Sequence, residues 1–138
     1  PLINLLNEYL TAMTDIILEE EGTVDKFVGD AIVAFWNAPL ESAEHAEKAV
    51  RASLRCQERL QAMRPDLHAR YGYEVVMRIG INTGYAIAGN MGSSSRFNYT
   101  VLGDAVNLAA RLEGANKYLG IRTMISRATR DRLGSQFH

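Results

Sequence analysis

The segment from Thr23 to Trp36 constrains the fold most, because its two β-rich runs leave room for only a two-residue connection. TVDKFV and AIVAFW are rich in Val, Ile and Phe, and only Gly29 and Asp30 separate them. A glycine followed by a polar residue between two such runs is typical of a tight β-hairpin with glycine at the first turn position. The sequence therefore predicts a hairpin here, with Asp30 at or beside its tip.

Helical periodicity flanks this hairpin. Residues 1–22 space their apolar side chains three or four apart, which predicts an amphipathic helix that ends at Gly22. A second, longer helix is expected to begin at a Ser42 cap and to be closed by Pro65. The only cysteine, Cys56, falls within this second pattern, and burial as a small hydrophobic residue is its simplest interpretation.

The second half of the chain alternates β-rich and helical runs. Strands are expected at residues 74–82 and 97–102, with a glycine-rich stretch and a serine loop between them. A helix over residues 105–119 follows, and residues 121–133 predict a short strand and then a helix capped by Ser126. The resulting order, α-β-β-α-β-β-α-β-α, favours the α+β class, with helices packed on one face of a mostly antiparallel sheet.

Size and charge exclude several classes of protein. A chain of 138 residues fits one domain, and 15 basic against 16 acidic residues argue against a nucleic-acid binder, which needs a strongly basic face. No run approaches the roughly 20 apolar residues that cross a bilayer, so we expect no direct membrane contact. One cysteine cannot form an intrachain disulfide, which favours a reducing, cytoplasmic setting. The three histidines are too scattered to suggest a metal cluster.

Two groups of polar residues are candidates for chemistry. Asp30, at a turn, is free to hold a hard cation such as Mg²⁺, which prefers oxygen ligands. From the pentapeptide Lys26–Asp30 alone, however, a turn aspartate and a solvated lysine are the simpler interpretation. Asn107 and Arg111 lie four apart on a predicted helix and project from one face, where an amide and a guanidinium suit a phosphate ester. A surface pair on an amphipathic helix is the alternative.

Together and in this order, these features resemble the class III nucleotidyl cyclases, particularly bacterial adenylate cyclases with two like catalytic domains. The resemblance covers residues 5–133 and rests on EGTVDKFVGDAIVAFWNAP, HAEKAVRAS and RIGINTGYAIAGNMGSSSRFNYTVLGDAVNLAARLEGANK. It implies a ferredoxin-like α+β core, with residues 1–138 forming a partial cyclase catalytic domain. The family's first strand precedes the opening helix and further strands follow Arg132, so the domain is expected to be incomplete at both termini.

The resemblance also implies a role for each candidate residue. Asp30 matches the second of two metal-binding aspartates. Lys26 matches the residue that reads the adenine base, and Thr100 matches its partner in base selection. Asn107 matches the residue that positions the ribose, and Arg111 the residue that stabilises the reacting phosphate. A lysine ammonium can only donate, which suits the acceptor N1 of adenine, whereas guanylate-specific members usually carry Glu and Cys at the two base-reading positions.

The implied function is adenylate cyclase activity: conversion of ATP to 3′,5′-cyclic AMP and pyrophosphate at the interface of a head-to-tail homodimer. Two Mg²⁺ or Mn²⁺ ions are expected, one to lower the pKa of the ribose 3′-hydroxyl and one to neutralise the triphosphate. The first metal-binding aspartate and the lysine that grips the terminal phosphates are expected outside residues 1–138, so this chain alone is expected to be nearly inactive. A membrane-bound sensor elsewhere in a longer signal-transduction protein is compatible with these features.

Two other functions are alternatives to this one. A degenerate, non-catalytic module that binds nucleotide or a partner domain is the alternative, although all five candidate residues are of the expected type. A diguanylate cyclase is disfavoured, because its hairpin motif would place acidic residues and a second glycine at positions 28–31. The loop Ser93–Ser95 with Arg96 suits either a phosphate cradle or an arm that reaches the partner domain, and the arm is preferred. Trp36 is expected to be a core aromatic and not a nucleotide stacker.

Overall fold

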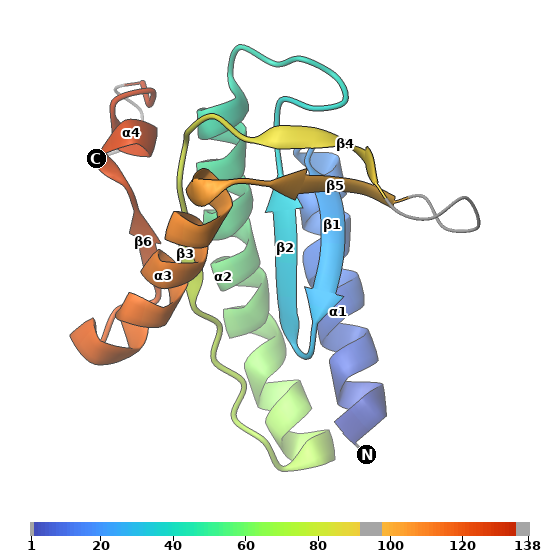
Figure 1. Ribbon diagram of the computed structural model, residues 1–138. Helices are drawn as coiled ribbons and strands as arrows, with labels where there is room; N and C mark the ends of the chain where they lie inside the picture. Colours follow the sequence, from blue (N-terminus) through green and yellow to red (C-terminus); the bar gives the residue numbers. More distant parts are fainter. Residues whose placement is uncertain (1, 92–97, 135–138) are drawn as a thin grey trace.

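The computed structural model describes residues 2–91 and 98–134, and these form an α+β fold (Figure 1). Its helices and strands, in chain order, are α1 (Leu2–Glu19), β1 (Thr23–Val28), β2 (Ala31–Phe35), α2 (His45–Tyr71), β3 (Ile79–Ile81), β4 (Ile87–Met91), β5 (Asn98–Leu102), α3 (Asp104–Leu119), β6 (Thr123–Ile125) and α4 (Arg127–Arg130). The strands pair as β1–β2 and β4–β5, both antiparallel, and as β3–β6, which is parallel. The α+β class and the mostly antiparallel pairing are therefore confirmed. Among the described residues, however, the strands form separate pairs and not one continuous sheet.

The hydrophobic core lies mainly between α1 and α2, with the β1–β2 hairpin packed against it (Figure 1). Its buried side chains recur at helical spacing and are Leu5, Tyr9, Met13 and Ile16 of α1 with Ala52, Cys56, Leu60 and Leu67 of α2. A period of 3.6 residues places each set on one face of its helix, so the two faces meet. The predicted burial of Cys56 is confirmed, since only 5% of this residue is exposed.

Trp36 links the hairpin to the helix pair. Its ring packs against the core, and its indole N–H donates to the carbonyl of Glu20 at 2.9 Å, which confirms the prediction of a core aromatic. Gly22 follows α1 as expected, but Glu21 and not Gly22 takes the left-handed conformation, with φ of 66°. A Cβ on Gly22 would lie 2.7 Å from the Trp36 ring. Glycine is therefore required here by the close approach of the indole.

Both predicted ends of the second helix are wrong. The helix begins after Glu44 and not at Ser42, whose side chain does not cap it. Pro65 lies inside α2 and does not close it. A proline within a helix loses one backbone hydrogen bond, but α2 continues because the turn beyond it buries Leu67 completely in the core. The helix ends at Tyr71, where Gly72 adopts the left-handed conformation.

The strand predicted over residues 74–82 is much shorter in the structure, where only Ile79–Ile81 is extended and paired. The carbonyl of Val75 accepts a hydrogen bond from the Arg64 guanidinium at 2.9 Å, and that of Met77 accepts one from the Gln57 amide at 3.1 Å. Side chains of α2 thus satisfy this backbone in place of a neighbouring strand. Conversely, β4 forms within the glycine-rich stretch that carried no strand prediction, because β5 supplies its hydrogen-bonding partner.

Other local predictions are confirmed. Gly29 occupies the first position of the hairpin turn with φ of 62°, and Val28 pairs with Ala31. The Ser126 side chain caps α4 by accepting from the backbone N–H of Thr129 at 3.2 Å.

Among the described residues, none of the helices combines the length and the apolar composition needed to cross a bilayer.

Candidate active site

Asp30 stands at the exposed tip of the β1–β2 hairpin, as the sequence predicted. Within the described residues, its carboxylate makes no hydrogen bond or ion pair. The same residues contain no group of three His, Cys, Asp or Glu side chains close enough to hold a metal ion. An uncommitted carboxylate fits Mg²⁺, which is commonly bound by one or two carboxylates together with substrate phosphates. Asp30 is thus suited to be one ligand of a site completed by other groups.

Lys26 and Thr100 come from segments far apart in the sequence and meet through Asp25. The Thr100 hydroxyl lies 2.7 Å from both carboxylate oxygens of Asp25 and donates to them. The backbone N–H of Val101 donates to the same carboxylate at 3.1 Å. The Lys26 ammonium lies 3.8 Å from Asp25, and 48% of the Lys26 side chain is exposed. The two predicted base-reading residues therefore flank one carboxylate, with the lysine still open to solvent.

A β-bulge gives Asp25 its direction. Val24 pairs with Ala34 and Lys26 pairs with Val33, so Asp25 is an extra residue on β1 with no partner on β2. A bulge of this kind locally re-aims a side chain and is common beside active sites. Here the carboxylate turns towards β5 and only 2% of it stays exposed. Asp25 is a neighbour of the candidate site that sequence reasoning missed; the available signal was the single acidic residue of the β-rich run TVDKFV.

Asn107 and Arg111 lie one turn apart on α3, and both are exposed. In the part of the chain that the structure describes, neither side chain has a hydrogen bond or ion pair. An amide and a guanidinium held on one helical face without protein partners are available to a ligand. The spacing therefore leaves the two side chains on one face of α3, as predicted, and their N–H donors are available to a ligand.

Close packing against β3 fixes the position of α3. A Cβ on Gly80 would lie closer than 3.0 Å to backbone atoms of Ala109, Leu112 and Glu113, so only glycine allows this contact. Asn116, which is completely buried, donates from its amide to the carbonyl of Ile79 at 2.8 Å. These two contacts hold the turn of α3 that carries Arg111, and the turn after it, against β3, so they fix the backbone from which the guanidinium projects.

The structure does not bring all five predicted residues together in one chain. The hairpin turn with Asp30 and the first turns of α3 lie towards opposite ends of β2 (Figure 1). No hydrogen bond or ion pair among the described residues joins Asn107 or Arg111 to Lys26, Thr100 or Asp30. A ligand bound by the hairpin group could therefore contact an Asn and an Arg of this kind only if a second chain supplied them. The predicted arm, Ser93–Ser95 with Arg96, lies outside the described residues.

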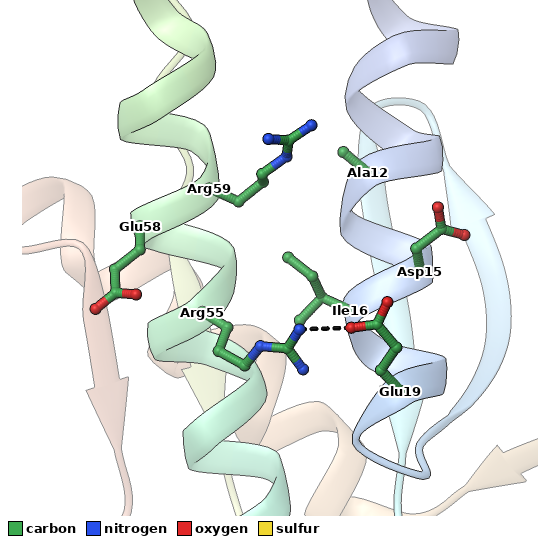
Figure 2. A pocket seen from close by; sticks show the side chains of 7 residues that line it. All are labelled: Ala12, Asp15, Ile16, Glu19, Arg55, Glu58 and Arg59. Atoms are coloured by element: carbon green, nitrogen blue, oxygen red, sulfur yellow. Dashed lines mark hydrogen bonds and ion pairs between the residues drawn. The ribbon is translucent and has the colours of Figure 1, made fainter.

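A groove between α1 and α2 is a poor candidate for the nucleotide site. Figure 2 shows its lining: Ala12, Asp15, Ile16, Glu19, Arg55, Glu58 and Arg59. Arg55, its central cation, is already paired with Glu19 and with Glu20. These hydrogen bonds raise the pKa of Arg55 above its ordinary value, so its charge is committed to the two carboxylates. None of the predicted site residues lines this groove.

Comparisons with known proteins find similarity to adenylyl and guanylyl cyclases. Adenylate cyclase 1 of Rhizobium meliloti (strain 1021) is 40% identical over 126 residues, which cover 91% of this chain and 19% of that protein. Among solved structures, the adenylyl cyclase CyaB from P. aeruginosa is 36% identical with a TM-score of 0.81 over 95% of this chain and 67% of that one. The guanylyl cyclase Cya2 is 33% identical with a TM-score of 0.88 over 99% of this chain and 68% of that one.

These relatives differ in the purine they act on, so overall likeness alone does not choose the substrate. The chain also spans about a fifth of the length of the Rhizobium protein. The family of adenylate and guanylate cyclase catalytic domains matches residues 1–138, which is the whole chain. This protein therefore belongs to the adenylate and guanylate cyclase catalytic domain family, the class III nucleotidyl cyclases.

Proposed function

We propose that this chain is the central part of an adenylate cyclase catalytic domain, which converts ATP to 3′,5′-cyclic AMP and pyrophosphate in the cytoplasm. The observation that carries this choice is the pair formed by Lys26 and Thr100 on either side of the Asp25 carboxylate. Two groups that must read the same base have to lie close together, and here they do. The adenylate cyclases among the relatives support the same substrate.

Lys26 would read adenine by donating to N1 of the base. An ammonium has three protons and no lone pair, so it can keep its contact with Asp25 while it donates to the base. Guanine carries a proton on N1 and would meet this ammonium as a second donor. Thr100 would contact the neighbouring edge of the same purine. Because Lys26 can only donate, the site favours ATP over GTP.

Asn107 and Arg111 would act on the sugar and the phosphate. In the reaction, a bond forms between the ribose 3′-oxygen and the α-phosphorus, the bond from that phosphorus to the pyrophosphate oxygen breaks, and the 3′-hydroxyl proton leaves to solvent. The Asn107 amide orients the ribose so that the 3′-oxygen faces the phosphorus. Arg111 stabilises the negative charge that builds on the α-phosphoryl oxygens, and loss of such a donor typically costs about 2.7–4 kcal/mol of barrier.

Asp30 would hold a divalent cation, Mg²⁺ or Mn²⁺. When bound, such ions neutralise phosphate charge and lower the pKa of a coordinated hydroxyl. The exposed, uncommitted carboxylate of Asp30 supports this assignment, because a carboxylate already paired with a lysine or arginine would be a poor ligand. The triphosphate itself would supply further oxygen ligands.

The complete site would lie between two cyclase domains paired head to tail. Asp30, Lys26 and Thr100 would come from one domain, and Asn107 and Arg111 from the other. The separation of these two groups within one chain supports this arrangement, as does the lack of protein partners for Asn107 and Arg111 among the described residues. Two equivalent sites would then form in a homodimer.

Mixing two inactive variants of the full-length protein tests this proposal. Asp30→Ala and Arg111→Ala should each abolish cyclic AMP formation from ATP in the presence of Mn²⁺. In a mixture, half of the dimers pair one variant with the other, and one of their two sites has both residues intact. We therefore expect about a quarter of the unmodified activity to return, because half of the dimers then carry half of their sites.

Three results would contradict the proposal. Activity that never returns on mixing, although the variants exchange subunits, would exclude a site shared between chains. Unaltered turnover by Asp30→Ala would exclude its role as a metal ligand. An unmodified protein that binds ATP and forms no cyclic AMP would instead identify the non-catalytic nucleotide-binding module.

A further inference from the structure

We infer that Asp25 is a positioning residue that sets the preference for adenine, because it forces the Thr100 hydroxyl to present only acceptor lone pairs to the base. This role rests on the proposed function, in which Lys26 and Thr100 read the purine. It adds a third residue to that pair, one that would touch the nucleotide only through its neighbours.

The Asp25 carboxylate is fully engaged by hydrogen bonds to β5. Both of its oxygens lie 2.7 Å from the Thr100 hydroxyl, and one also accepts from the backbone N–H of Val101 at 3.1 Å. Only 2% of this side chain is exposed, so it is closed to bulk water. Asp30, in contrast, is exposed on the same hairpin and suits a metal ion. The two aspartates of the hairpin thus have different environments and different roles.

The β-bulge in β1 directs this carboxylate towards β5. An alternating strand would direct residues 24 and 26 to one face and residue 25 to the other. The bulge at Asp25 breaks that alternation, so Asp25 reaches across to Thr100, which lies 75 residues further along the chain, while the next residue, Lys26, stays within 3.8 Å of the same carboxylate. A single inserted residue therefore couples both base-reading side chains.

Hydrogen-bond chemistry links this geometry to selectivity. An ionised carboxylate is an acceptor only, whereas a hydroxyl has one proton and two lone pairs. Because the single Thr100 proton is given to Asp25, the hydroxyl can offer a ligand only its lone pairs. The exocyclic amino group of adenine is a donor and matches them, whereas O6 of guanine is an acceptor and does not. Asp25 would therefore turn a hydroxyl that could serve either base into one that accepts from adenine.

Replacement of the carboxylate by an amide tests the inference. In Asp25→Asn the new side chain can donate to Thr100, whose proton is then free to rotate towards a base. We expect the ratio of kcat/KM for ATP over GTP, measured on the full-length protein with Mn²⁺, to fall about tenfold, the effect of one mispaired hydrogen bond. Thr100→Val should lower the ratio similarly. Adding Asp25→Asn to Thr100→Val should change the ratio little further, because Asp25 acts through that hydroxyl.

Two further variants separate positioning from a purely structural role. Asp25→Glu keeps an acceptor-only group and should retain the preference for ATP even where the melting temperature falls. Thr23→Val is the matched control on the same strand, because it removes the hydroxyl that donates to the Ala38 carbonyl at 2.8 Å. It should lower the melting temperature and leave the nucleotide ratio unchanged.

The outcomes distinguish this inference from the proposed function. If the unmodified protein prefers ATP and Asp25→Asn leaves the ratio of kcat/KM for ATP over GTP unchanged, the inference alone is overturned. Asp25 would then serve only to hold β1 against β5. Should Asp25→Asn fail to fold, a loss of the ratio in Asp25→Glu as large as in Thr100→Val would overturn it equally. An unmodified protein that turns over neither nucleotide would overturn the proposed function, and the inference with it.

Discussion

Replacement of Gly80 by alanine should damage both stability and catalysis through one backbone contact. Gly80 lies in the middle of β3, and its Cα faces the turn of α3 from Ala109 to Glu113. An alanine Cβ would lie 2.9 Å from the carbonyl carbon of Leu112 and closer still to the Ala109 oxygen and the Glu113 nitrogen. All three are backbone atoms, so no side chain can rotate away, and α3 itself must move.

The size of the effect follows from that displacement. Overpacking of a well-packed contact typically costs about 1–3 kcal/mol, and α3 would have to shift by about 1 Å to restore normal contact distances. Arg111 lies between Ala109 and Glu113, so its guanidinium would shift with the helix. A displacement of about 1 Å in a positioned catalytic group can lower the rate by about a hundredfold. We therefore expect a modest loss of stability and a large loss of kcat/KM.

Calorimetry and cyclic AMP formation by the full-length protein measure the two effects. Gly114→Ala is the matched control, because Gly114 lies on the same helix and a Cβ there would meet nothing within 4 Å. Alanine is the better helix former by about 1 kcal/mol, so Gly114→Ala should raise the melting temperature and preserve activity. If Gly80→Ala proved as stable and as active as Gly114→Ala, the packing of β3 on α3 would not position Arg111 as argued.

Two other predictions concern the base site and the core. Lys26→Glu combined with Thr100→Cys should shift preference from ATP towards GTP, since a carboxylate accepts from the guanine N1–H; competition assays with both nucleotides measure this, and an unchanged ratio would remove these residues from base selection. Burial raises the pKa of the Cys56 thiol to about 11. Because the thiolate is the reactive form, iodoacetamide at pH 8 should modify Cys56 about a hundredfold more slowly than a free cysteine, and urea should abolish the difference. Rapid labelling of the folded protein, followed by mass spectrometry, would contradict this burial.

Features that depend on neighbouring residues were predictable from the amino-acid pattern. The helices α1 and α3, the glycine of the hairpin turn and the Ser126 cap all depend mainly on residues close in sequence, and the structure contains them. Asp30 was placed at the tip of the hairpin for the same reason. The spacing of Asn107 and Arg111 likewise needs only helical geometry.

Features that depend on distant partners were not predictable in this way. Pro65 stays within α2 because Leu67 is buried against other elements, and β4 forms in a glycine-rich stretch because β5 pairs with it. The bond between Asp25 and Thr100 joins residues 75 apart and depends on a one-residue bulge. Local pattern sets which conformations each segment favours, whereas hydrogen bonds between strands form only when folding brings their donors and acceptors together. For this protein, that physical difference separates residues recognised by type, such as Lys26, from Asp25, whose hydrogen bond with Thr100 is visible only in three dimensions.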